Sequence, residues 1–175
     1  MRIEPRILMF LHAFADLVDG MNNRVGRWVT YGIFIIMAIL LWSTLSRVAL
    51  APSLWTLESA QFSLVAYYFL GGAFAMQQEA HVRMDLLYGD WSTRRKACFD
   101  AVTSVCLLFY LGVLFYGGFD SLSYALEYGE RSASAWRPYL WPVKMIILLS
   151  LTLMLLQSLA MLARDILCLR GHPAP

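Results

Sequence analysis

Four long apolar runs divide the chain, and none of them contains Asp, Glu, Lys, Arg or His. They cover residues 29–46, 59–78, 101–119 and 145–163. Each run holds 18 to 20 residues, and at about 1.5 Å per residue an α-helix of that length spans the ~30 Å hydrocarbon core of a bilayer. The pattern therefore predicts four transmembrane helices, over residues 28–48, 57–78, 97–120 and 143–164.

The first 26 residues have an amphipathic pattern instead of a uniformly apolar one. His12, Asp16, Asp19 and Asn23 recur at helical spacing, with apolar residues around them. Such a polar stripe is typical of a helix that lies at the membrane surface or against a neighbouring helix. We therefore expect residues 1–26 to form an interfacial helix. Two arginines ahead of a short apolar run leave a cleaved signal peptide as the alternative.

The composition also indicates a membrane protein. Hydrophobic residues make up 59% of the chain, charged residues only 15%, and the mean hydropathy is +0.58. A soluble domain carries about 25% charged residues, and a soluble fold with four such buried helices would lack polar residues to cover its surface. The predicted fold is an all-α membrane protein. The formal net charge of +2 is too small to indicate a nucleic-acid partner.

Positive residues are distributed unequally between the two sides of this arrangement. Ten of the 14 lysines and arginines lie before the first span, between the second and third, or after the fourth. Cytoplasmic segments carry the excess of positive charge in membrane proteins. Both termini, including a short tail at 169–175, are therefore predicted to be cytoplasmic, with the spans in the inner membrane.

The apolar runs contain no candidate catalytic or ion-carrying group. A membrane enzyme or ion-coupled carrier usually places an ionisable side chain within the bilayer. The three histidines lie outside the runs, which does not suggest haem ligation. Cys98 and Cys106 would be about 12 Å apart on one helix, beyond the roughly 7 Å limit for a disulfide. We predict no catalytic residue, metal or cofactor, and keep an autonomous small exporter or redox enzyme as the alternative.

Two further sets of residues are candidates for contacts with other helices or proteins. Gly71, Gly72 and Ala75 would let another helix approach the second span closely. Charged residues near the outer ends of the spans are candidates for docking a periplasmic partner, with simple interfacial solvation as the alternative: Glu58, Asp120, Glu127, Glu130, Arg131 and Arg137.

A compact group of charged residues follows the second span, at Glu79, His81, Arg83 and Asp85. The stretch Gly71-Gly72-Ala73…His81-Val82-Arg83-Met84-Asp85-Leu86-Leu87 resembles the signature of the small membrane subunit (DctQ type) of tripartite ATP-independent periplasmic (TRAP) transporters. The resemblance extends over roughly residues 24–168. We expect Arg83 and Asp85 to form an ion pair that orders the turn after the second span.

The resemblance implies a role that depends on partners. In such systems a periplasmic substrate-binding protein captures an organic anion, often a carboxylate, and a large multi-span permease subunit carries it inward with sodium ions. The small subunit would be a non-catalytic scaffold, paired about one-to-one with the large subunit, which would be a separate chain and would hold the sodium ions. It would also help to dock the binding protein. The motif does not indicate which compound is transported.

Overall fold

The computed structural model describes residues 5–49, 53–78 and 93–169. Its helices are α1 (Pro5–Ala49), α2 (Thr56–Gln77), α4 (Thr93–Glu127) and α5 (Trp141–Leu169). The described residues form no β-strand; one isolated antiparallel bridge pairs Arg131 with Tyr139. The prediction of an all-helical fold is confirmed for this part of the chain. The expected tail begins at the last residue of α5 and otherwise lies outside the described residues.

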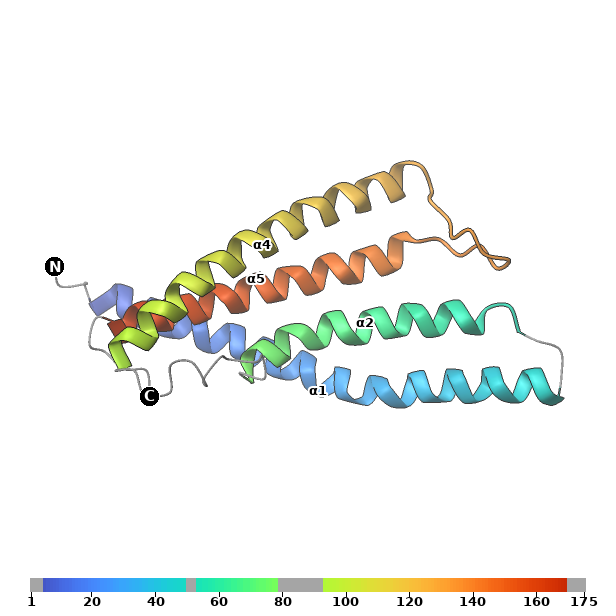
Figure 1. The fold of residues 1–175 in the computed structure, drawn as a ribbon, viewed down its shortest axis with the longest axis horizontal. Helices are drawn as coiled ribbons and strands as arrows, with labels where there is room; N and C mark the ends of the chain where they lie inside the picture. Colours follow the sequence, from blue (N-terminus) through green and yellow to red (C-terminus); the bar gives the residue numbers. More distant parts are fainter. Residues whose placement is uncertain (1–4, 50–52, 79–92, 170–175) are drawn as a thin grey trace.

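The four helices form two hairpins (Figure 1). α1 pairs with α2, and α4 pairs with α5. α2 also packs on α5, and α1 contacts α5, so α5 joins the two hairpins. In Figure 1 the hairpins converge where α1 begins and α5 ends, and they separate toward their connecting loops. The contacts of α1 and α2 with α5 therefore hold the two hairpins together.

The first helix is continuous, and it includes most of the segment expected to lie at the membrane surface, residues 1–26. α1 runs through 45 residues, from the expected interfacial segment into the expected first span. No proline interrupts it after its first residue. Ala15 and Val18 are buried against Ala160 of α5, so this part of α1 packs on the bundle. The apolar side of this part of α1 therefore faces α5. The sequence pattern alone was equally compatible with contact to lipid.

Three of the four helices are long and apolar enough to cross a membrane. The qualifying segments are Ala13–Ala49, Val102–Glu127 and Trp141–Arg164. α2 is as long as an ordinary span, but Gln61, Ser63 and two tyrosines make it less apolar. Membrane helices are supported, while the count of four spans stays a prediction.

The end of α4 and the start of α5 can be explained by the residues found there. α4 continues to Glu127, beyond the expected third span at 97–120. The proline-rich segment that follows is not helical, although Pro142 is the second residue of α5. Proline is tolerated in a first helical turn because its missing N–H has no intrahelical partner there.

Small residues let α2 approach both of its neighbours. Gly72 lies against Met154 of α5, where an added Cβ would be 3.3 Å from the methionine sulfur. Gly71 faces Val29 of α1 at 3.8 Å. The two glycines named from the sequence thus face different helices, and Ala75 beside them is half-buried.

A third glycine sets the distance between α1 and α2. A Cβ at Gly26 would lie 2.3 Å from the ring of Phe74 and 2.8 Å from its Cβ. Atoms at such distances overlap, so the helices could not approach this closely with a larger residue at position 26. The sequence analysis did not single out Gly26, because its partner is on another helix.

Candidate functional site

A polar cluster joins α1 and α5 where the hairpins converge. Asn22 of α1 is 1% exposed and Gln157 of α5 is fully buried. The Nδ2 of Asn22 donates to the Oε1 of Gln157 at 2.6 Å. The Nε2 of Gln157 donates to Asp19 Oδ1 at 2.9 Å. One buried amide side chain thus binds two residues on successive turns of α1.

Asp19 is the centre of this cluster. Its second carboxylate oxygen forms an ion pair with Arg164 of α5. Its backbone oxygen accepts a hydrogen bond from Gln77 Nε2 of α2 at 3.1 Å. Three helices therefore meet at one residue, and its charge is compensated by a guanidinium and by an amide donor. The carboxylate, the guanidinium and the amide nitrogens bind one another, so the cluster positions the helices; the amide oxygens of Asn22 and Gln77 have no partner among the described residues.

Only part of this cluster was predicted from the sequence. Asp19 was placed on a polar stripe, and Arg164 is the last residue of the expected fourth span, 143–164. The sequence analysis did not identify Asn22, Gln77 or Gln157. A usable signal existed for Gln157, because it is the only side-chain amide in its apolar run, and an amide in a membrane helix usually binds another helix.

At the opposite end of the bundle, Glu58 connects α2 with the loop between α4 and α5. Its side chain is 5% exposed, and its Oε1 accepts a hydrogen bond from Ser132 Oγ at 3.0 Å. Its Oε2 is buried without a hydrogen-bond partner among the described residues. Glu58 therefore holds the outer loop, and it is not available on the surface of this chain for a docking partner.

Hydroxyl groups continue this contact toward α1. Thr56 Oγ1 lies 3.2 Å from Ser43 Oγ and 3.1 Å from Ser53 Oγ, and Ser53 Oγ lies 3.2 Å from Ser46 Oγ. Ser43, Ser46 and Thr56 are buried. The outer turn of the first hairpin is thus closed by short side chains that bond to one another.

Two cations order the outer end of the second hairpin. Lys144 of α5 pairs with Glu130 and also donates to the backbone oxygen of Ser121 at 3.2 Å. The guanidinium of Arg131 lies 4.1 Å from the ring centre of Tyr139 and bonds its hydroxyl. Arg137 is exposed in the same loop, with φ at 50°. These contacts fix Glu130 and Arg131 within the loop between α4 and α5.

An open hollow of about 520 Å³ lies beside this loop, on the last turns of α4. Its acidic lining residues are Asp120, Glu127 and Glu130, and its one cation is Lys144. Tyr124 and Tyr128 stack with ring centres 4.6 Å apart in the same lining. Since Glu130 is paired with Lys144, Asp120 and Glu127 leave the hollow with an acidic character.

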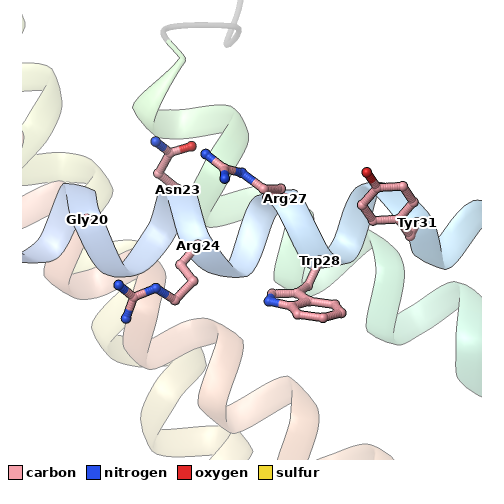
Figure 2. A pocket seen from close by; sticks show the side chains of 6 residues that line it. All are labelled: Gly20, Asn23, Arg24, Arg27, Trp28 and Tyr31. Atoms are coloured by element: carbon pink, nitrogen blue, oxygen red, sulfur yellow. The ribbon is translucent and has the colours of Figure 1, made fainter.

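A second hollow, of about 500 Å³, runs along α1 near the other end of the bundle (Figure 2). Its lining residues all belong to α1: Gly20, Asn23, Arg24, Arg27, Trp28 and Tyr31. They recur at helical spacing, so they form one exposed face. This face combines two cations with two aromatic rings.

Several predicted residues cannot be placed in the structure. Glu79, His81, Arg83 and Asp85 lie outside the described residues, as does the side chain of His12. Asp16 is exposed on α1. Among the residues that the structure describes, no group of three His, Cys, Asp or Glu side chains could hold a metal ion.

Comparison with protein families identifies the chain. The family model for tripartite ATP-independent periplasmic transporters, DctQ component, matches residues 36–168, well over half of the sequence. The chain belongs to the DctQ family. The resemblance seen in the motif is thereby confirmed. No curated protein and no solved structure matches the chain.

Membership in the DctQ family implies that this chain is a small membrane component of a TRAP transporter and associates with the other components. The match covers α2, α4 and nearly all of α5, but it begins within α1. The hollow beside the α4–α5 loop, which we call the outer hollow, therefore lies inside the matched region. Asp19, Asn22 and the hollow of Figure 2 lie before it.

Proposed function

We propose that this DctQ chain is the non-catalytic scaffold of a sodium-driven TRAP transporter for an organic anion such as a carboxylate. It packs beside a large permease subunit, about one-to-one, in the inner membrane, with both termini in the cytoplasm. The permease subunit binds the sodium ions and the substrate. The outer end of the bundle helps to receive the periplasmic substrate-binding protein. The family match carries this proposal.

The distribution of exposed side chains supports the scaffold role. Large apolar residues are exposed along α1 and α4, including Phe34, Leu41, Phe109 and Tyr116. Such faces suit lipid or the apolar surface of another membrane subunit. The four apolar runs contain no Asp, Glu, Lys, Arg or His to carry an ion. Two faces are thus available for a large subunit, and ion coupling is left to that subunit.

The outer hollow is the surface best suited to receive the binding protein. Asp120 and Glu127 are exposed there, and the Lys144–Glu130 pair holds α5 to the loop beside them. Arg131 and Arg137 are exposed on the adjoining loop. A charged surface of this kind steers a partner of complementary charge and fixes its orientation. Glu58 acts indirectly, by holding this loop against α2.

Co-purification with reconstitution tests the scaffold role. The chain, tagged and extracted from its native membrane in mild detergent, should retain one large multi-span subunit at about one-to-one stoichiometry. In liposomes, the pair should take up an organic anion only with an inward sodium gradient and the binding protein present. Purification of the chain alone, or uptake by the large subunit without it, would contradict the proposal.

A charge reversal tests the docking surface separately. Glu127→Lys should slow uptake at low concentrations of binding protein, with recovery at high concentrations, because an exposed interfacial charge mainly changes the association rate. Asp16→Lys is the matched control, since Asp16 is an exposed carboxylate on α1 near the opposite end of the bundle. Equal uptake curves for the two variants would exclude the hollow as the docking surface.

A further inference from the structure

The hollow along α1 lies where the helix changes from polar to apolar. The charge-free run begins two residues after Arg27, and it is long enough for the hydrocarbon core of a bilayer. Arg24 and Arg27 therefore lie at the level of the phospholipid headgroups. Trp28 is 75% exposed and Tyr31 is 61% exposed. Tryptophan and tyrosine are enriched at this depth because their rings are apolar and their N–H and O–H groups are polar.

The two guanidinium groups are free to bind a ligand. Neither Arg24 nor Arg27 forms a hydrogen bond or an ion pair with any residue that the structure describes. By contrast, Arg164 on α5 is paired with Asp19. Asp19 is thereby occupied by α5 and does not neutralise the arginines that follow it on α1. The hollow thus carries two uncompensated positive charges.

The side chains that line the hollow project from one stretch of α1 (Figure 2). In this view Asn23 and Arg27 lie above the α1 ribbon, and Arg24 and Trp28 lie below it. At Gly20, nothing lies within 4 Å of the position a Cβ would occupy, so the hollow is open at this end. A guanidinium presents several N–H donors, and two guanidinium groups can bind different oxygens of one phosphate. The lining therefore suits a tetrahedral anion of headgroup size.

The face continues below the arginines as an apolar surface. Phe34 and Ile35 are exposed, one turn beyond Tyr31. A phosphate bound by the arginines would thus have aromatic rings beside its glycerol region and apolar side chains beneath. The order of arginines, aromatic rings and apolar side chains along α1 thus matches the order of phosphate, glycerol and acyl chains along a phospholipid. A free phosphate would use only the first part of this surface.

We propose that the α1 face of Gly20, Asn23, Arg24, Arg27, Trp28 and Tyr31 is a binding site for one anionic phospholipid. Arg24 and Arg27 bind the headgroup phosphate. Asn23 adds an amide donor, and Trp28 and Tyr31 lie beside the glycerol and first acyl carbons. The site lies before the region matched by the family model, and it does not depend on the proposed transport function.

Native mass spectrometry of the purified full chain tests the site. The chain is titrated with dioleoyl phosphatidylglycerol and, separately, with dioleoyl phosphatidylcholine, which differ in headgroup charge and not in acyl chains. We expect a preference for phosphatidylglycerol. At about five-fold in affinity for each arginine near a membrane surface, Arg24→Gln with Arg27→Gln should reduce that preference about 25-fold.

Two controls separate the site from general attraction to anionic lipid. Arg47→Gln removes an exposed arginine at the other end of the same helix and should leave the preference unchanged. Soluble sn-glycerol 1-phosphate, added in excess, should not displace the bound lipid, because it lacks the acyl chains. The single variants Arg24→Gln and Arg27→Gln, each expected to lose about five-fold, replace the double variant if its circular dichroism shows a loss of helix.

Three results would overturn the proposal. Equal affinity for the two lipids in the unmodified chain would show that the arginines do not select charge. An equal loss in Arg47→Gln would show that any arginine near the membrane surface suffices. Displacement by sn-glycerol 1-phosphate would reveal a site for soluble phosphate, without a lipid.

Discussion

Replacing Gln157 with leucine tests whether the polar cluster holds the two hairpins together. Gln157 is fully buried and binds both Asn22 and Asp19 of α1. Leucine has a similar volume and no polar atoms. The replacement therefore removes two interhelical hydrogen bonds without opening a large cavity.

The expected cost follows from these contacts. Each hydrogen bond between helices contributes about 0.5–1.5 kcal/mol in a membrane protein. The amide nitrogen of Asn22 would also stay buried without its acceptor, which costs about 1–3 kcal/mol. These terms add to about 2–6 kcal/mol, and because Asp19 keeps its ion pair with Arg164 we expect a net loss near the lower end, about 2–3 kcal/mol. Adding Asn22→Leu should recover part of this loss, because it removes the unpaired amide.

The measurement is the free energy of unfolding of the purified chain in mixed micelles, from an SDS titration followed by circular dichroism. Gln61→Leu is the matched control, because Gln61 is exposed on α2 and its replacement should change stability by less than about 0.5 kcal/mol. If Gln157→Leu is as stable as the control, the cluster does not join the hairpins. A further loss on adding Asn22→Leu would also refute this account.

Three other changes test contacts elsewhere. Gly26→Ala should destabilise the chain by about 1–3 kcal/mol in the same titration, because its Cβ would overlap Phe74. Gly20→Ala is the control and should not destabilise the chain, because its Cβ would meet no atom within 4 Å. Equal effects of the two replacements would contradict the close approach of α1 and α2. Ser132→Ala should accelerate amide hydrogen exchange in residues 128–140, because Glu58 then no longer holds the loop; unchanged exchange would reject that role. Arg83→Ala with Asp85→Ala should weaken co-purification with the large subunit, while the binding protein keeps its affinity for substrate; normal assembly and transport would exclude the expected ion pair.

Much of the fold follows from local features of the sequence. Helix α2 occupies almost the same residues as the predicted second span, 57–78. The other expected spans, 28–48, 97–120 and 143–164, each lie within a longer helix. Charge-free runs and the prolines around them are properties of neighbouring residues. They can be recognised in the sequence without knowing which helices touch. The family could likewise be recognised from one short motif.

The functional surfaces are less predictable for a physical reason. A helix that is apolar all round shows no inward face, so its sequence does not say which residues meet another helix. Asn22 and Gln157 are 135 residues apart in the chain, and Ser132 and Glu58 are 74 apart. Glu58 was named from its position as a candidate for docking a periplasmic partner, and the structure buries its side chain against Ser132 of the α4–α5 loop. Such pairings depend on the rotation and approach of whole helices.

The amino-acid sequence by itself determined a helical membrane protein of the DctQ family, because hydropathy, charge and the motif are local. The tertiary structure decided that α1 is one helix packed on α5, that Asp19 joins three helices, and that Arg24 and Arg27 face outward. These results depend on which side of each helix is covered. That choice comes from packing between residues distant in the chain, where Gly26 admits Phe74 and Gln157 meets Asn22.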